Sequence, residues 1–367
     1  MAVLAAERRS RILGLARKTG SVRVTDIAET LQVSEATVRR DLDSLAADGV
    51  LDKVYGGATL SQERAAAAGR VIQVGVFIPP LTAYYPRIVD GIRDLADQPD
   101  SGLALNLALP QTSPDETVAD IIAAEREAIS GLLDAGVDGL LLLPALEHRT
   151  RPSDEARDYA GWLRRLEVPT MLMDRELPEL TLGSPSTIRM AHERGAAAAV
   201  HYLYELGHRR IALMARTDTQ TAELIQAGWR QAVDDLDLDQ ELPFIPGKDS
   251  LTWPGWTGDR LDDVLALLRR RKITALLCHN DEDALTLVRH ARSRGVAIPD
   301  QLSVIAYEDE LAALAQPALT AIQPPRRELG LYAIRTLLDQ IRGTAPAATQ
   351  RITLDPALII RASTAPR

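Results

Sequence analysis

Apolar residues near the N-terminus recur with the spacing of short amphipathic helices. In residues 34–45, SEATVRRDLDSL, the side chains of Val38, Leu42 and Leu45 fall on one helical stripe. The two adjacent arginines of this stretch point away from the stripe. Ser34 suits the N-cap position, because its hydroxyl can accept a backbone N–H that has no partner inside the helix. The pattern therefore predicts a helix with a cationic outer face.

The segments around this helix decide between a plain surface helix and a functional one. A helix is predicted over residues 7–18, a short β-strand over 21–24 and a second helix over 25–31. Gly49 is expected to end the arginine-bearing helix, and residues 51–60 alternate in polarity around a Gly-Gly turn, which predicts a β-hairpin or wing. This order of elements within about 60 residues is typical of a DNA-binding module.

From residue 71 onward, short apolar runs alternate with amphipathic helical patterns. The runs are too short for core helices and several are rich in β-branched residues, so we expect buried strands. These strands are predicted at 71–78, 103–109, 137–144, 169–174, 210–215, 273–281 and 302–309, with helices near 86–97, 115–135, 154–166, 187–206, 220–236, 257–271 and 282–294. Alternation of this kind predicts an α/β fold with parallel sheets, which at this length should split into two lobes.

Composition and charge restrict the class of protein. No uncharged run reaches the ~18 residues of a membrane helix, and the N-terminus lacks an apolar signal core, so we expect a cytoplasmic protein. Residues 1–70 contain 11 Lys/Arg and 9 Asp/Glu, whereas the remaining residues contain 31 and 42. DNA would repel the acidic part, so DNA contacts must be local. Residues 61–70 are expected to form a linker, and their four alanines also permit a helix.

Polar side chains follow four of the predicted strands. In parallel sheets, ligands bind beyond the carboxyl ends of the strands, so these residues are candidates for a binding cleft. An acid at such a place can instead cap the next helix. Carboxylates, an amide and aromatic rings together suit a polyhydroxylated ligand. The candidates are Tyr84, Tyr85, Asp174, Arg175, Asn280, Asp281, Glu308 and Asp309.

The run VSEATVRRDLDSLAADGVLDKVYGGA resembles the winged helix–turn–helix of the deoxyribose-operon repressor family. The resemblance covers about 55 residues and implies that residues 34–45 enter the major groove of DNA. Asp41 is expected to orient the neighbouring arginines rather than to touch DNA. The DNA-binding residues implied in this way are Ser34, Thr37, Arg39, Arg40, Lys53 and Tyr55.

Residues 71–363 resemble the effector domain of the lac- and galactose-repressor family. The similar pieces are MLMDRE, HYLYELGHRRIALM, AGWRQAV, CHNDEDAL and LSVIAYEDELAALAQPALTAIQPPRRELG. The resemblance implies a two-lobed fold like that of periplasmic sugar-binding proteins. It also implies that Asp174, Asn280 and Glu308 hold sugar hydroxyls, and that Trp253 stacks on the sugar or packs at a helix edge.

The resemblance gives the expected domain boundaries. The DNA-binding head spans residues 1–60, the linker 61–70 and the ligand-binding domain 71–363. The first lobe is expected at about 71–186 and 323–345, and the second at about 187–322 and 346–363. Crossings between the lobes are expected near residues 187 and 322.

Three departures from the family pattern concern the pocket and the linker. Ile225 stands where the family usually has an arginine, and Glu308 stands where it usually has an aspartate. Arg175 or Arg216 could supply the missing cation. Residues 61–70 do not match the short hinge helix with which family members bind the minor groove.

The sequence thus predicts a ligand-responsive transcription repressor of a carbohydrate-utilisation operon, released from operator DNA by a sugar-like effector. An enzyme of carbohydrate metabolism is the alternative from another class, but no nucleophile, phosphate-loop or metal motif accompanies the acids, so neither catalysis nor a cofactor or metal is expected. A solute-binding transport protein would need a signal segment. A homodimer is expected, and the apolar face of Ile88, Ile92 and Leu95 is either its interface or part of the core. The protein should lie on the nucleoid when bound to DNA.

Overall fold

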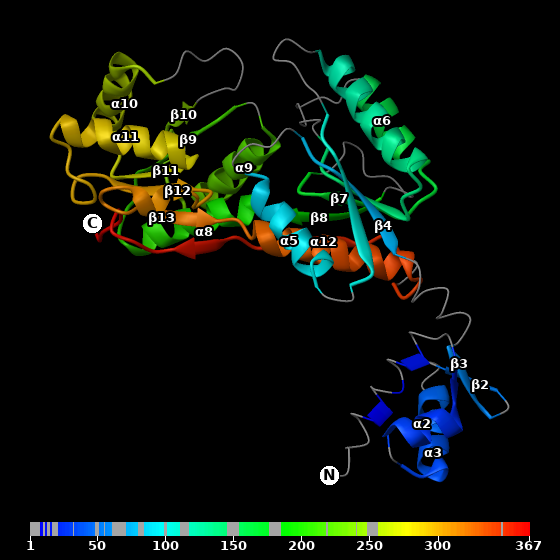
Figure 1. Ribbon diagram of the computed structural model, residues 1–367. Coiled ribbons are helices and arrows are strands. Elements are labelled where there is room, and N and C mark those ends of the chain that lie inside the picture. Colours follow the sequence, from blue (N-terminus) through cyan, green and yellow to red (C-terminus); the bar gives the residue numbers. More distant parts are fainter. Residues whose placement is uncertain are drawn as a thin grey trace. The chain divides into compact units, whose positions relative to one another are not determined.

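The chain forms two compact units, one of residues 1–72 with 100–104 and one of the remaining residues, which we call the head and the effector domain. No described helix is long and apolar enough to cross a membrane. The computed structural model describes residues 8–9, 12, 15–16, 21–31, 33–47, 51–54, 56–60, 71–79, 84–98, 101–110, 117–144, 154–175, 185–217, 219–239, 241–247, 256–345 and 348–367 (Figure 1).

The head contains the expected helix–turn–helix and wing. Val38, Leu42 and Leu45 are buried, as their stripe predicted, and they pack with Ile12 and Ile27. Most of the helix predicted over 7–18, the predicted stop at Gly49 and the linker 61–70 lie outside the described residues. The head's elements are β1 (Ser21–Arg23), α2 (Val24–Leu31), α3 (Glu35–Ala47), β2 (Leu51–Val54) and β3 (Gly57–Leu60), and its strands form an antiparallel sheet in the order β1-β3-β2.

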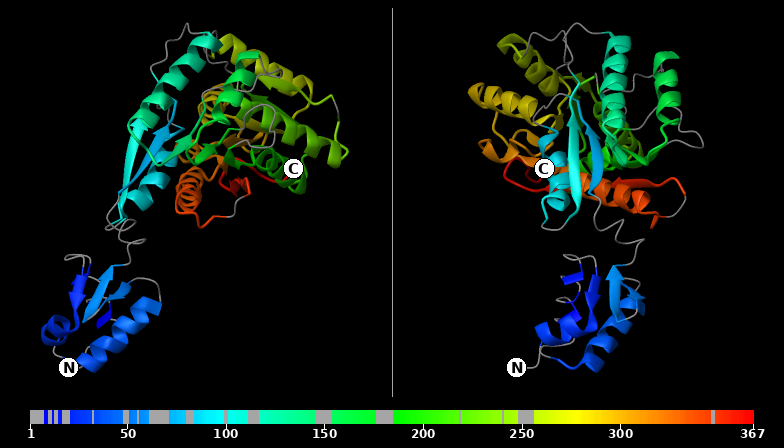
Figure 2. Two further views of the ribbon diagram at one scale, coloured as in Figure 1. Left: turned by 90° about the vertical axis from the view of Figure 1, so that its right-hand side faces the viewer. Right: turned by 45° about the vertical axis from the view of Figure 1, so that its right-hand side comes forward.

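The effector domain begins with a six-stranded sheet that forms its first lobe. Apolar side chains of α6 and α7 pack with Leu140, Leu142 and Leu172 of this sheet. The order of the sheet is β14-β8-β7-β6-β4-β5 (Figure 2). The elements of this lobe are β4 (Ile72–Phe77), α5 (Pro86–Ala96), β5 (Leu103–Ala108), α6 (Val118–Asp134), β6 (Gly139–Leu142), α7 (Asp154–Leu163), β7 (Thr170–Met173), β8 (Ser186–Met190), α12 (Arg326–Ile341) and β14 (Arg351–Leu354).

A second six-stranded sheet forms the other lobe, in the order β10-β9-β11-β12-β13-β15. Strands β9, β11 and β12 are buried at every position, as expected for parallel strands covered on both faces. Cys278 is buried here, as a small apolar side chain would be. The elements are α8 (His192–Glu205), β9 (Ile211–Ala215), α9 (Gln220–Asp235), β10 (Phe244–Pro246), α10 (Gly258–Arg270), β11 (Ala275–His279), α11 (Asp281–Ser293), β12 (Ser303–Tyr307), η1 (Ala312–Leu314), β13 (Thr320–Gln323) and β15 (Ala357–Ile359).

Helices α5 and α12 pack against each other at very short range. A Cβ atom on Gly91 of α5 would lie 1.9 Å from the carbonyl oxygen of Arg327, and one on Gly330 of α12 would lie 2.0 Å from that of Ile88. Ile88 and Ile92 are buried in this contact, so the candidate dimer interface on α5 is wrong: the face is occupied within the same lobe. Leu95 is partly buried.

The crossings between the lobes differ in part from the expected ones. The helix predicted over 187–206 is wrong at its start, because residues 186–190 form β8 in the first sheet and the chain crosses at Ala191. The crossing expected near residue 322 follows β13. The last crossing lies between β14 and β15, ten residues later than expected, because Arg351–Leu354 pair with β8 in the first lobe.

Candidate functional site

The outer face of α3 carries the side chains predicted to contact DNA. Arg40 is exposed and makes no hydrogen bond or ion pair within the described part of the chain. Arg39 is 67% exposed and forms an ion pair of 2.9 Å with Glu35, one helical turn earlier. At the start of the helix, the hydroxyls of Ser34 and Thr37 lie 2.9 Å apart.

Ser34 also caps α3. Its side-chain and backbone oxygens accept from the backbone N–H of Thr37, at 3.3 and 2.9 Å. Its hydroxyl therefore has a structural role at the helix start, as its N-cap position predicted. The same hydroxyl lies at the end of α3 where the positive end of the helix dipole would favour a phosphate.

Asp41 has a different partner from the one expected. Its carboxylate is buried and accepts two hydrogen bonds from Arg8, of 2.5 Å from Nε and 3.2 Å from Nη2. It therefore joins α3 to the N-terminal helical residues and does not orient Arg39 or Arg40. The sequence offered no local sign of this, because Arg8 and Asp41 are 33 residues apart.

The wing is tied to α3 by a second ion pair. Lys53 on β2 is exposed, and its ammonium contacts the carboxylate of Asp43 on α3. This pair sets the side chain of Lys53 beside the outer face of the helix. Tyr55, the other predicted wing residue, lies outside the described residues.

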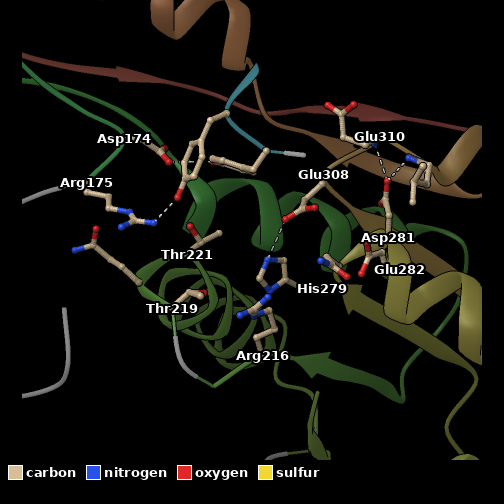
Figure 3. A pocket seen from close by; sticks show the side chains of 15 residues that line it. Asp174, Arg175, Arg216, Thr219, Thr221, His279, Asp281, Glu282, Glu308 and Glu310 are labelled. Atoms are coloured by element: carbon tan, nitrogen blue, oxygen red, sulfur yellow. Dashed lines mark hydrogen bonds and ion pairs between the residues drawn. The ribbon is translucent and has the colours of Figure 1, made fainter. Parts of the chain in front are cut away.

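The effector domain contains a cavity of about 450 Å³ that both lobes line. It lies beyond the carboxyl ends of β7, β9, β11 and β12, where the sequence pattern predicted a cleft (Figure 3). Trp253 lies outside the described residues. Of the eight candidates at strand ends, all but Asp309 line this cavity. The lining residues are Tyr84, Tyr85, Asp174, Arg175, Arg216, Thr219, Gln220, Thr221, His279, Asn280, Asp281, Glu282, Glu308, Glu310 and Leu311.

The first lobe contributes a hydrogen-bonded wall. The Tyr84 hydroxyl donates to Oδ2 of Asp174 at 3.1 Å, and Arg175 donates to the Tyr85 hydroxyl at 2.8 Å. Burial and the nearby Asp174 carboxylate raise the pKa of the Tyr84 phenol well above its ordinary value, so Tyr84 stays protonated and acts as a donor. Arg175 also donates to the carbonyl of Pro144, which fixes its guanidinium at this wall.

The second lobe contributes an amide and a carboxylate. The Oδ1 atom of Asn280 accepts from the backbone N–H of Asp283 at 3.4 Å and so caps α11, which was the alternative reading of a polar residue at this place. The Nδ2 group is not used by this cap. Glu308 lies 3.7 Å from Nε2 of His279, measured to Oε1, and its backbone has a φ of 107°, which non-glycine residues rarely adopt.

Asp281 lines the cavity and holds the backbone of the segment that follows β12. Its carboxylate is buried and accepts from the backbone N–H groups of residues 309–312, at 2.7–3.3 Å. Desolvation by burial raises the pKa of Asp281 to about 6, against the lowering effect of the N–H donors. Asp309, another candidate at a strand end, forms a buried ion pair with Arg361 instead and does not line the cavity.

Sequence reasoning missed part of the cavity wall in the second lobe. Arg216 follows β9 and was named only as a substitute cation, whereas Thr219, Gln220 and Thr221 at the start of α9 were not selected. The search for polar residues at strand ends covered four strands and did not include β9. Ile225 is buried in the core of the second lobe, so no cation stands at that position and Arg216 is the nearest arginine on this side. Of the two arginines proposed as substitutes, both line the cavity.

Comparison with known sequences and structures shows which proteins have a similar head and effector domain. Models of a DeoR-like helix-turn-helix domain and a periplasmic binding protein-like domain match residues 8–64 and 200–364. The arabinose metabolism transcriptional repressor of Geobacillus stearothermophilus is 26% identical over 345 residues, which are 92% of this chain and 90% of that protein. The chain is thus similar along nearly its whole length to a transcriptional repressor, and a solved sugar-binding transcriptional regulator of the LacI family from Escherichia coli superposes on it with a TM-score of 0.60 and 25% identity. Its head is similar to DeoR-like helix-turn-helix domains.

Two further similar proteins match nearly the whole length or the fold of this chain. The transcriptional repressor CytR of Escherichia coli K12 is 28% identical over 92% of this chain and 95% of that protein. A dimeric lac repressor with an 11-residue C-terminal deletion superposes with a TM-score of 0.62 and 26% identity, covering 81% of this chain and all of that one. The two-lobed parallel α/β fold expected from the sequence is thereby confirmed.

Proposed function

We propose that this protein represses transcription by binding operator DNA as a homodimer, and that a small polyhydroxylated effector in the cavity between the lobes releases it. The observation that carries the proposal is the convergence of seven residues, chosen from strand ends of the sequence, around one cavity. As a repressor of chromosomal operators, it would act in the cytoplasm and on the nucleoid.

The donors and acceptors of the cavity support a polyol as the effector. Carboxylates at Asp174 and Glu308 accept hydrogen bonds from hydroxyls, and the Nδ2 group of Asn280 donates to them. Arg216 supplies a cation on the α9 side. A volume of about 450 Å³ is large enough for a sugar. The relatives support this class: one is named for arabinose metabolism, and a similar structure, 22% identical with a TM-score of 0.58, is described with bound ribose.

The head supports DNA binding. Arg40, Arg39 and Lys53 line one face of α3 and the wing, and phosphate contacts are the expected role of such cations. One head would read one half-site, so two heads on a two-fold operator raise the affinity. A similar structure, of the lac repressor dimer, is described as bound to operator.

Effector binding and DNA binding would be coupled through the arrangement of the two lobes relative to each other. A ligand that contacts both lobes favours the arrangement in which both walls reach it, and it changes DNA affinity only by its preference for that state. Operator DNA must then change effector affinity by the same factor, typically about 5–150-fold. We propose induction rather than corepression.

A carbohydrate screen by thermal shift tests the proposal. A sugar present at ~100 times its dissociation constant should stabilise the effector domain by about 2.7 kcal/mol. The sugar found in this way is then titrated with and without operator, and equal dissociation constants would show that the two sites are not coupled. The rival reading, an enzyme acting on sugars, predicts turnover of the bound sugar, which product analysis in the same samples would detect.

A further inference from the structure

Arg326 is a buried arginine at the crossing between the lobes that sequence reasoning did not select. It is the first residue of α12, and its side chain is 1% exposed. A charged group without water needs compensating partners, and burying one is costly. Its Nη2 atom donates to the backbone carbonyl of Glu308 at 2.6 Å and to the Glu310 carboxylate at 2.5 Å.

Arg326 joins parts of the two lobes. Its backbone belongs to α12, which packs tightly on α5 in the first lobe, whereas Glu308 and Glu310 follow β12 in the second. Its guanidinium also lies over the ring of Tyr84, 4.8 Å from the ring centroid. Glu310 forms a second ion pair, of 2.7 Å, with Arg87 of α5. One carboxylate of the second lobe is thus held by two arginines of the first.

The contacts of Arg326 act on two residues of the effector cavity. Glu308 has a φ of 107°, which persists only when surrounding contacts hold it. The bond from Arg326 to the Glu308 carbonyl is one such contact, and the bond from the Glu308 N–H to the carbonyl of Ile322 is another. On the other wall, the guanidinium fixes the ring of Tyr84, whose hydroxyl donates to Asp174.

We infer that Arg326 is a positioning residue that clamps the two lobes together and aims Glu308 and Tyr84 into the effector cavity. The orientation of these two side chains toward an effector depends on the function proposed above. The contact between the lobes does not depend on it. Arg326 itself does not line the cavity. Its Nη2 atom makes both hydrogen bonds while the planar guanidinium lies over the Tyr84 ring, and a lysine ammonium has no planar group to cover that ring.

The neighbouring Arg327 provides a matched control. It also lies in α12 and forms a bidentate ion pair with Asp94 of α5, with both distances 2.7 Å. This pair is exposed and lies within the first lobe. Arg327→Met therefore removes the same charge and a comparable ion pair without touching a contact between the lobes.

The experiment measures the distance between the lobes in the ligand-free, full-length protein. Spin labels are attached to Ser130→Cys on α6 and Asp259→Cys on α10, both exposed, while the native Cys278 is buried and stays unlabelled. In this background, Arg326→Met and Glu310→Gln should each lengthen and broaden the distance distribution. Arg327→Met should leave it unchanged. If the distance distributions of Arg326→Met and Glu310→Gln were the same as those of Arg327→Met and the wild type, the clamp between the lobes would be refuted.

Effector affinity is the second readout. For a sugar identified by the thermal-shift screen, Arg326→Met should weaken binding about tenfold or more, and Arg326→Lys should restore only part of it. Arg327→Met should change it by less than about twofold. Equal losses in Arg326→Met and Arg327→Met would overturn the positioning role. If no sugar binds the wild type, the proposed function fails, and the distance measurement still decides whether the clamp exists. If Arg326→Met does not fold, Glu310→Gln, which keeps Arg326 in place, carries the distance readout, and Arg326→Lys carries the affinity readout.

Discussion

Replacement of Gly91 by alanine tests the close packing of α5 on α12. The added Cβ would lie 1.9 Å from the carbonyl oxygen of Arg327, where ordinary contact begins near 3.4 Å, so the two helices must separate by about 1.5 Å. Overpacking of this kind typically costs about 1–3 kcal/mol. Alanine's helix propensity offsets about 1 kcal/mol of that cost.

Gly131→Ala on α6 provides the control for this change. Gly131 is also within a helix, but nothing lies within 4 Å of its Cβ position, so the substitution should stabilise by about 0.5–1 kcal/mol. The free energy of unfolding of the two variants should differ by about 1–3 kcal/mol. The difference between them contains the clash alone, because the gain in helix propensity is common to both.

Tryptophan fluorescence during urea unfolding measures this difference. All four tryptophans lie between residues 162 and 256, so their fluorescence follows the effector domain and not the head. Gly91→Ala should also lower effector affinity. Arg87 of α5 and Arg326 of α12 both pair with Glu310, and separation of the two helices would move these arginines apart. If Gly91→Ala were as stable as Gly131→Ala, the packing described here would be wrong.

Three further predictions concern DNA, effector and pH. Arg40→Ala should weaken operator binding and flatten the salt dependence of log K by about one unit, measured by fluorescence anisotropy, and Arg39→Ala should do so less if the Glu35 pair persists on DNA. Asp174→Ala should cost about 1–3 kcal/mol of sugar binding by calorimetry and leave ligand-free operator binding intact. Asp281 has a pKa of about 6 in the folded state, above its ordinary value of 3.8. Protonation of Asp281 therefore stabilises the folded protein by up to about 3 kcal/mol at a pH below 3.8, and this stabilisation is lost as the pH rises through 6. The wild type should lose stability relative to Asp281→Asn over that range, and a gain would contradict the desolvation argument.

The sequence predicted the strands that form continuous apolar runs and missed the short strands β10, β13, β14 and β15. β9, β11 and β12 are continuous apolar runs, and each was expected within one or two residues. β14 and β15 alternate between exposed and partly buried positions at sheet edges, so no apolar run marks them. β8 was taken as the start of α8, because only its pairing with β7 and β14 separates the two elements.

The cavity was predictable where its residues directly follow strands. Tyr84, Asp174, Asn280 and Glu308 are separated in sequence by up to 224 positions, and the topology of parallel sheets alone brings them together. Arg326 had no such signal. An arginine in the first turn of a helix faces the positive end of the helix dipole, which is a locally unfavourable place. Its role exists only through the tertiary contacts with Glu308, Glu310 and Tyr84.

The buried polar atoms that lack hydrogen-bond partners lie mostly around the cavity and the lobe crossings. Among the described residues they include Oδ1 of Asp174, Nε2 of His192, Nδ1 of His279 and two nitrogens of Arg326, with Nε of Arg126 on α6 as the exception. Asp174 Oδ1 and His192 Nε2 face each other at 3.7 Å, beyond hydrogen-bond length. His192 begins α8 directly after the first crossing, so a small rotation between the lobes would bring these atoms into contact or part them further. Asp174 and His279 line the cavity, so polar groups of the proposed effector can supply the partners that native proteins give most of their buried polar groups.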